Sequence, residues 1–450
     1  AAQVAALTSD IVWLVERPVT LPNGEVRKVL VPQVYVRVKD GDLDGSGALI
    51  AAEQLQLNVS GDVINSGTLA GRSVLALTAE NIHNLGGRIE ADNATVQARQ
   101  NLDNLGGVIG AVNALTIGAG HDITVASTTH DSANEQGNRT NLSRIAGLYV
   151  SGADGTMQVA AGNDLSLNAA QVVNAGKGAT VLSAGHALNL GTVTESAQQN
   201  TRWDGNNWRQ EANRTEAGTS IQTIGDLQLN AGQDINARGA KVSSDSGAVQ
   251  LNARRDINLS DAQNYQFADE AHRSTGGNGL FSHTTTTTRD TLSQTLTQGT
   301  TVSGDTVHLQ ADRDINLRGS NVVSTTQTEL SADRNITLEA ARNQVEEHHE
   351  KTEIKSGLFS GGGIALTIGT QEQGADDRST QHSAVASNVG ATDGNVLIVA
   401  GNDYRQVGSH VTAPKGDIAI NAQRIDILEG RDLSEQTHES RFKQSGISVT

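Results

Sequence analysis

A phrase of the form Ala-Gly-x-Asp-Ile-x-Leu recurs along this chain, and it constrains the fold more than any other feature of the sequence. Paired copies repeat at nearly constant intervals; Asp234 and Asp256, for example, are 22 residues apart. The clearest copies begin at Ala119, Ala161, Ala231, Ala253 and Ala311, and weaker copies begin at Ala184, Ala332 and Ala400. A fixed period of about 20 residues with short alternating apolar runs indicates a solenoid. We therefore expect an elongated rod, whose function depends on length, surface and insertions more than on a pocket.

A related phrase containing Asn and Gly occupies residues 41–126. Asn65, Asn84 and Asn104 recur there at intervals of 19 and 20 residues. The alternating runs between them predict strands with one buried face, and the Asn-Gly joints predict tight turns. One turn of chain per repeat, with each strand pairing to its counterpart in the next coil, predicts an all-β fold, a right-handed parallel β-helix.

Stacking would bring equivalent polar residues of successive coils into register. The three Asn side chains could then form an amide ladder. In the Asp-Ile-x-Leu phrase, Ile and Leu are expected to point inward, while the Asp lies at a corner and can cap backbone N–H groups of the bend. These structural repeat residues are Asn65, Asn84, Asn104, Asp122, Asp164, Asp234, Asp256 and Asp314.

Longer, less regular segments separate the pairs of coils. We interpret them as lateral β-hairpins, able to pair with one another as an accessory sheet, at about 127–150, 194–220, 261–300, 341–391 and 429–450. They contain eight of the eleven aromatic residues. Two interpretations remain open: the hairpins cover and stabilise the rod, or they contact a partner or a membrane. The candidate contact residues are Trp203, Trp208, Leu280, Phe281, Leu358, Phe359, Ile364, Leu366 and Ile368.

The first forty residues differ from the repeats. They hold three of the four prolines, and they predict two strands, Ile11–Val19 and Val26–Val38, around an Asn-Gly turn. We expect residues 1–40 to form a hairpin that caps or joins the rod, since solenoid ends need covering. The repeats then divide into coils at 41–126 and coil pairs alternating with hairpins at 127–450.

Composition argues against several function classes. The 33 basic and 50 acidic residues give a net charge of −17, whereas nucleic-acid binding calls for a basic patch. The chain has no cysteine, which fits a secreted protein that stays unfolded before export. It has no apolar run of transmembrane length and no P-loop, dinucleotide fingerprint or zinc spacing, so we expect no cofactor.

Two groups of ionisable residues allow a catalytic or metal-binding alternative. Residues 346–350 read Glu-Glu-His-His-Glu, but adjacent His residues of a strand face opposite ways, which favours a charged hairpin stem over a metal site. Some parallel β-helices cleave polysaccharides and need carboxylates that converge on one groove. The corner Asp residues instead recur with the repeat, which favours structure over catalysis. We expect a protein that is not an enzyme.

The coil phrases resemble the haemagglutinin repeats of filamentous haemagglutinin-type exoproteins, which are exported by two-partner secretion. The opening segment DIVWLVERPVTLPNG, from Asp10, and the segment SGLFSGGGIALTIG, from Ser356, resemble the stick-like effectors of contact-dependent growth inhibition. The second of these points to their toxin-proximal repeat region. The resemblance covers essentially the whole chain. The chain begins without Met and stops within an insertion, so we expect a fragment of a longer protein.

The resemblance implies a secreted, outer-membrane-anchored surface protein that delivers a C-terminal toxin across the outer membrane of a neighbouring cell. The implied partners are a two-partner secretion transporter during export and the target-cell outer membrane or a surface receptor. An immunity protein would act only on the toxin domain, which is not recognisable here. The alternative function is an adhesin shaft that attaches to cells or biofilm matrix. A carbohydrate-active enzyme is the third hypothesis, and it predicts depolymerase activity lost on one carboxylate substitution.

Overall fold

The computed structural model describes residues 11–20, 26–35, 47–277, 282–360 and 366–449. Within these residues the chain forms strands and turns and no helix, which confirms the predicted all-β class. Contacts divide the chain into two compact units, residues 1–49 and residues 50–450.

The first unit contains an antiparallel hairpin of β1 (Ile11–Thr20) and β2 (Val26–Tyr35). Ile11 lies opposite Tyr35, and Thr20 lies opposite Val26. The predicted Asn-Gly turn falls outside the described residues. The capping role of this hairpin stays a prediction.

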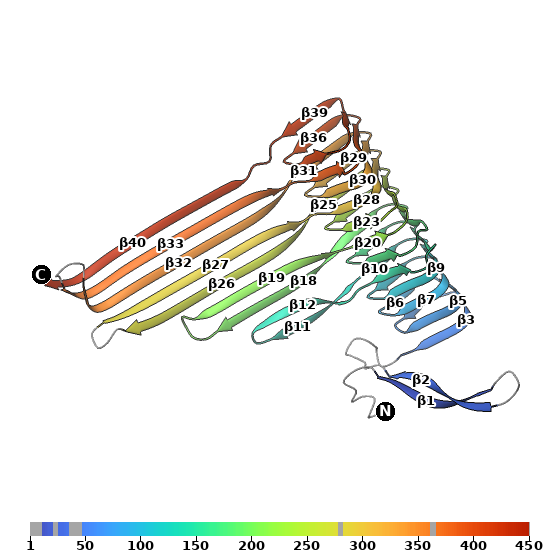
Figure 1. Cartoon of the computed structure of the whole chain (residues 1–450), viewed down its shortest axis with the longest axis horizontal. Helices are drawn as coiled ribbons and strands as arrows, with labels where there is room; N and C mark the ends of the chain where they lie inside the picture. The colour runs from blue at the N-terminus through green and yellow to red at the C-terminus, as the bar shows by residue number, and fades with distance from the viewer. Residues whose placement is uncertain (1–10, 21–25, 36–46, 278–281, 361–365, 450) are drawn as a thin grey trace. The chain divides into compact units, whose positions relative to one another are not determined.

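The second unit is built from stacked coils with three strand-bearing faces (Figure 1). On the first face, strands of successive coils pair in parallel; Ile123 lies opposite Leu102 on one side and opposite Leu165 on the other. This face contains β4 (Val63–Asn65), β6 (Ile82–Leu85), β8 (Leu102–Leu105), β10 (Ile123–Ala126), β15 (Leu165–Asn168), the start of β18 (Leu188–Arg202), β22 (Ile235–Arg238), β25 (Asp256–Ser260), β29 (Asp314–Arg318), β31 (Asn335–Glu339), β36 (Asp403–Val407) and β39 (Arg424–Leu428).

The second and third faces continue each coil and are also parallel. The second face contains β13 (Gly147–Val150), β16 (Gln171–Asn174), β20 (Ser220–Thr223), β23 (Lys241–Ser244), β34 (Asn388–Ala391) and β37 (His410–Thr412). The third face contains β14 (Thr156–Ala161), β17 (Thr180–Ala184), β21 (Leu227–Ala231), β24 (Val249–Ala253), β35 (Asn395–Ala400) and β38 (Ile418–Asn421). Longer strands belong to these faces as well: β3 (Leu49–Asn58), β5 (Thr68–Ala79), β7 (Arg88–Ala98), β9 (Val108–Ala119), β28 (Thr301–Ala311) and β30 (Asn321–Ala332). The coils are thus arranged as in a parallel β-helix.

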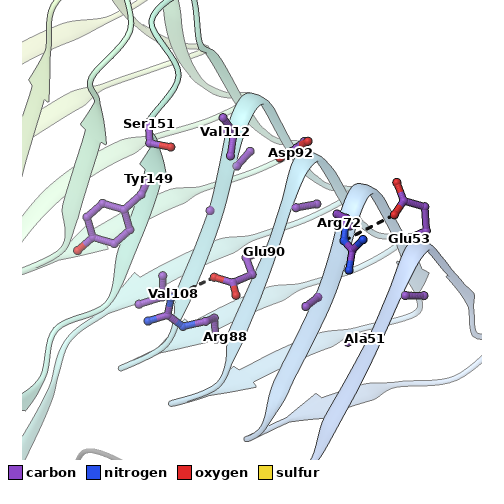
Figure 2. A pocket seen from close by; sticks show the side chains of 16 residues that line it. Ala51, Glu53, Arg72, Arg88, Glu90, Asp92, Val108, Val112, Tyr149 and Ser151 are labelled. Carbon is purple, nitrogen blue, oxygen red and sulfur yellow. Dashed lines mark hydrogen bonds and ion pairs between the residues drawn. The ribbon is translucent and has the colours of Figure 1, made fainter. Parts of the chain in front are cut away.

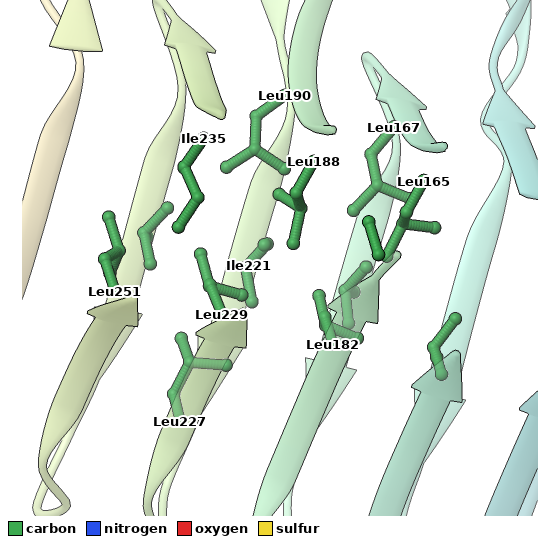
Figure 3. Close-up of a cluster of buried hydrophobic side chains, with 14 of the residues drawn as sticks. Leu165, Leu167, Leu182, Leu188, Leu190, Ile221, Leu227, Leu229, Ile235 and Leu251 are labelled. Atoms are coloured by element: carbon green, nitrogen blue, oxygen red, sulfur yellow. The ribbon is translucent and has the colours of Figure 1, made fainter. Parts of the chain in front are cut away.

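Apolar side chains from all three faces fill the interior of the coils (Figure 3). Ile257 and Leu259, the two apolar positions of the repeated phrase, are 0% and 1% exposed. Their neighbours along the strand point outward, as a period of two requires. Burying one such side chain contributes about 1.5–3 kcal/mol, so the narrow core is the main source of stability.

The three repeated Asn residues form a buried ladder at the edge of the first face. The Nδ2 atom of Asn65 donates to Oδ1 of Asn84 at 2.8 Å, and Nδ2 of Asn84 donates to Oδ1 of Asn104 at 2.7 Å. Asn84 also donates to the Gly87 carbonyl oxygen. A Cβ atom on Gly87 would lie 2.4 Å from Nδ2 of Asn65, so the turn beside the ladder requires glycine.

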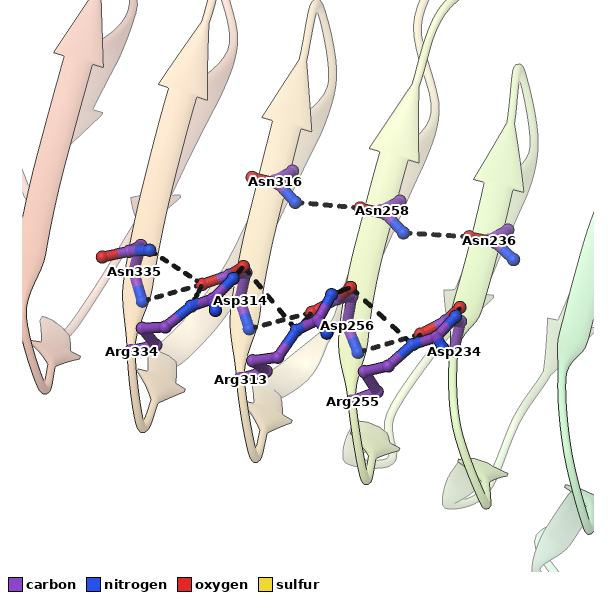
Figure 4. A network of polar contacts seen from close by, with 10 residues as sticks. All are labelled: Asp234, Asn236, Arg255, Asp256, Asn258, Arg313, Asp314, Asn316, Arg334 and Asn335. Carbon is purple, nitrogen blue, oxygen red and sulfur yellow. Dashed lines mark hydrogen bonds and ion pairs between the residues drawn. The ribbon is translucent and has the colours of Figure 1, made fainter.

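The corner Asp residues join each coil to the next one. Oδ1 of Asp256 accepts a hydrogen bond from the backbone N–H of Asp314, and Oδ1 of Asp314 accepts one from the N–H of Asn335 (Figure 4). The capping predicted for these carboxylates therefore reaches the bend of the following coil and not the bend that carries the Asp. The same bond is accepted by Asp62, Asn81, Asn101, Asp122, Asp164, Asp234 and Asn335.

Arginine residues reinforce this corner in the later coils. Arg255 donates to Asp234, and Arg313 donates through Nε to Oδ1 of Asp256 at 2.9 Å (Figure 4). The Arg255 guanidinium holds the pKa of Asp234 below its ordinary value, because it donates hydrogen bonds to the ionised carboxylate. An Arg-carboxylate fork fixes orientation as well as charge.

Substitution of Asn84 by Ala tests the buried ladder. The change removes the acceptor for Asn65 and the donor for Asn104, and buried polar groups without partners cost about 1–3 kcal/mol each. We expect a loss of about 2 kcal/mol or more in the free energy of unfolding, measured by urea denaturation. Asn138→Ala removes an exposed amide in a hairpin and should cost less than about 0.5 kcal/mol. Equal losses in the two variants would contradict the ladder's role.

Candidate functional site

The hairpins form a single antiparallel sheet, called the hairpin sheet here, that extends from the first face of the coils (Figure 1). Its strands are β11 (Thr128–Asn134), β12 (Gly137–Arg144), β18, β19 (Trp208–Gly218), β26 (Ala262–Gly277), β27 (Ser282–Gln298), β32 (Ala341–Ser360), β33 (Leu366–Val385) and β40 (Leu433–Val449). Neighbouring hairpins pair with one another, as β19 does with β26 and β27 with β32. The segments Gly147–Val150 and Asn388–Ala391, which the sequence analysis included in hairpins, are strands of the coils.

The outgoing strand of each hairpin continues a strand of the first face, and the returning strand leads into a strand of the second face. In β18, Leu188 pairs in parallel with Leu165 of the coil, whereas Thr192 pairs antiparallel with Gly218 of the hairpin. β26 and β32 begin shortly after β25 and β31 end. We call the point where a hairpin leaves the coils its root. The spacing of the stacked coils places the roots of successive hairpins side by side, close enough for their strands to pair.

A buried carboxylate holds the root of the second hairpin. The Glu216 side chain is 2% exposed; it accepts bonds from Thr192 and Thr194 and forms ion pairs with Arg214 and with Arg238 of the coil. Burial raises the pKa of Glu216, but these donors outweigh burial and bring it below the ordinary value. At the next root, Nε of Arg318 in a coil strand donates to Oδ1 of Asp261 at 2.7 Å.

Buried hydroxyl groups mark the junctions between coils and hairpins. Thr300 donates to the Ser260 carbonyl oxygen at 2.8 Å and accepts from the Ala240 N–H, and it is 0% exposed. Ser127, Thr219 and Ser387 make equivalent bonds to carbonyl oxygens of adjacent coils. Sequence reasoning missed these residues. For Thr219, Thr300 and Ser387 the signal is a Thr or Ser after a small residue and two positions before Ile or Val, as in Gly299-Thr300-Thr301-Val302; Ser127 lacks the apolar residue.

The two predicted Trp residues flank the turn between β18 and β19. Trp203 is 59% exposed and stacks on His272 at 5.9 Å between ring centroids. The Arg289 guanidinium lies 5.7 Å from the Trp208 ring centroid, so Trp208 already has a cation partner within the sheet.

The distal end of the sheet carries an exposed apolar row. Leu358, Ile368 and Ile447 lie directly opposite one another on β32, β33 and β40, and they are 40%, 64% and 76% exposed. We call these three residues the distal apolar row. The structure thus brings Leu358 and Ile368 together, although the sequence analysis did not single out Ile447. Phe359 and Leu366 pair through their backbones with Thr367 and Ser360, while Leu280, Phe281 and Ile364 fall outside the described residues.

In the part of the hairpin sheet nearer the coils, charged residues lie on both faces. His348 contacts Asp376 at 3.0 Å, whereas the adjacent His349 contacts Asp290 at 2.8 Å on the opposite face. Within the described part of the chain, no group of three or more such side chains could hold a metal ion. The same part of the chain has no helix long and apolar enough to cross a membrane.

The sequence of the coil stack and its hairpins matches the model of a known protein family. The model of the hemagglutinin repeat matches residues 204–292 and 281–446, more than half of the 450-residue chain. The chain belongs to the hemagglutinin-repeat family. It resembles a deoxyribonuclease CdiA of Dickeya dadantii, with 32% identity over 73% of this chain, and the tRNA nuclease CdiA-2 of Burkholderia pseudomallei, with 25% identity over 69%. A tRNA nuclease CdiA of Escherichia coli is 27% identical over 74% of the chain.

The match is to a small part of these relatives. The chain spans 10% of the length of each of the three CdiA proteins. No solved structure matches it. The chain is therefore a CdiA-like haemagglutinin-repeat region, a stick segment of the kind found in secreted surface exoproteins.

Replacing Thr300 by Val tests whether the buried hydroxyls secure the hairpin junctions. The change keeps the shape but leaves the Ala240 N–H and the Ser260 carbonyl without this partner. We expect a loss of about 1–3 kcal/mol in the free energy of unfolding, measured by urea denaturation. Thr287→Val, on the exposed surface of β27, is the matched control and should change stability by less than about 0.5 kcal/mol. A Thr300 variant as stable as this control would rule the junction role out.

Proposed function

We propose that this chain is a non-catalytic stick segment that helps deliver a C-terminal toxin across the outer membrane of a target cell. The observation that carries the proposal is the distal apolar row, exposed at the far end of a sheet rooted in a stiff coil stack. The rod presents the sheet, and the distal end of the sheet contacts the target membrane.

The distribution of charge limits how much of the sheet enters lipid. A strand that crosses a bilayer needs an apolar outward face along its whole span. β32 instead carries Glu347 and His349 on one face and His348 and Glu350 on the other. We therefore propose contact by the distal end, not insertion of whole hairpins.

The remaining partners follow from the same proposal. A two-partner secretion transporter exports the chain to the bacterial surface, and the target-cell outer membrane or a surface receptor takes it up. An immunity protein would bind only the toxin domain. We also propose that the coils are right-handed, as parallel crossovers generally are. We propose further that the chain divides into a capping segment at 1–40, coils at 41–126, and coil pairs alternating with hairpins at 127–450.

The names of the relatives include nuclease activities, and we propose that these activities lie outside this segment. Catalysis needs one convergent constellation, whereas the corner carboxylates recur once per coil. Asp256 and Asp314 already accept backbone N–H groups and Arg side chains. These bonds support a structural role for them.

Protease protection with outer-membrane vesicles tests the proposal. We expect vesicles to protect the distal ends of β32, β33 and β40, with fragments mapped by mass. The double variant Ile368→Asp, Ile447→Asp should lose at least half of this protection, because it places two charges in the distal apolar row.

Leu296→Asp is the matched control, since Leu296 is 39% exposed near the root of the same sheet. It should keep the protection of the intact chain. Cleavage unchanged by vesicles would refute the membrane contact. Vesicle-independent attachment of the chain to whole cells would instead favour the adhesin shaft.

A further inference from the structure

An open groove of about 960 Å³ runs along the coils that precede and follow the first hairpin (Figure 2). Five strands of neighbouring coils line it: β3, β5, β7, β9 and β13. It therefore follows the axis of the stack and lies across several coils. The groove is separate from the distal apolar row.

The floor of the groove is a register row of outward-facing residues. Ala70 lies opposite Glu90, Glu90 opposite Gly110, and Gly110 opposite Tyr149. Because equivalent positions of successive coils are about 4.8 Å apart, the row repeats a contact position at that interval. The small residues Ala70 and Gly110 leave space above the floor between the larger side chains.

Tyr149 forms one wall of the groove. The Tyr149 ring lies over Gly147, since a Cβ atom built on Gly147 would meet the ring, so a larger residue at this position would displace the ring. The hydroxyl group donates to Oε1 of Gln171 at 3.0 Å and holds the ring in this position. Figure 2 shows the ring spread beside the groove. A fixed aromatic face is suited to stacking against a flat ligand with apolar C–H groups.

Charged side chains of both signs line the rest of the groove. Arg88 pairs with Glu90 at 3.0 Å, and Arg72 pairs with Glu53 at 3.6 Å. Asp92 adds a third carboxylate. The pairs offer hydrogen-bond donors and acceptors side by side, but the local charge does not attract an anion.

We propose that this groove binds a neutral glycan, a run of hexose units that lies along the coil axis. One sugar ring stacks on Tyr149, and the hydroxyl groups of its neighbours bond to the Arg88–Glu90 and Arg72–Glu53 pairs. Three carboxylates against two guanidinium groups disfavour a nucleic acid or an acidic polysaccharide. Addition of an extended peptide to the sheet needs a free strand edge, whereas β5, β7 and β9 have both edges paired.

Calorimetric titration of the intact chain tests this assignment with three probes: cellohexaose, maltohexaose and, as the anionic comparison, hexagalacturonate. We expect at least one neutral hexamer to bind and the anionic one to bind at least tenfold more weakly. Tyr149→Ala should weaken the neutral ligand about tenfold, whereas Tyr149→Phe, which keeps the ring, should stay within about threefold. Gly110→Trp fills the floor and should abolish binding.

Tyr265→Ala, which removes a half-exposed tyrosine of the hairpin sheet, is the control and should leave binding unchanged. Thermal melting of every variant separates lost binding from lost folding, and Tyr149→Phe keeps the test decisive if Gly110→Trp does not fold. The assignment is overturned if neither neutral hexamer binds the intact chain. It is also overturned if Tyr149→Ala binds as tightly as the intact chain, or if the anionic hexamer binds most tightly.

Discussion

Parallel pairing between equivalent residues of successive coils is the interaction on which the rest of this structure depends. It fixes the axial spacing, and it places every polar corner residue next to its counterpart in the following coil. The amide ladder of Asn65, Asn84 and Asn104 and the corner bonds of Asp256 and Asp314 exist only because that register holds. Such bonds link nearest neighbours, so stability accumulates coil by coil, as in other solenoids.

The hairpin sheet follows from the same register. Its outgoing strands leave the first face, and its returning strands rejoin the coils, at intervals set by the coil spacing. The roots of the hairpins therefore lie at distances that allow antiparallel pairing. Carboxylates at the roots, such as Glu216 and Asp261, bind arginines of the coil strands. The coil thus determines where the sheet stands, and the length of each hairpin determines how far it reaches.

Much of this architecture could be predicted from the sequence, because a fixed period and alternation report which residues face inward. Ile257, Leu259 and the three ladder Asn residues are examples. Periodicity does not show in which direction along the rod a corner side chain points. The hydrogen bonds from the corner carboxylates to the next coil were therefore not predicted. The junction hydroxyl of Thr300 was missed because its pattern recurs only once per hairpin, at Thr219, Thr300 and Ser387, and not once per coil. The distal row was only partly found, since Ile447 joins it through pairing between strands that are far apart in sequence.

Hydrogen exchange followed by mass spectrometry on the purified chain tests most directly whether the coil register builds the hairpin sheet. The account predicts slow exchange of amides in the paired central parts of β26, β27, β32 and β33, together with slow exchange in the first face of the coils. Rapid exchange throughout these four strands, while the coils stay protected, would contradict it, because the hairpins would then be independent of the rod that carries them.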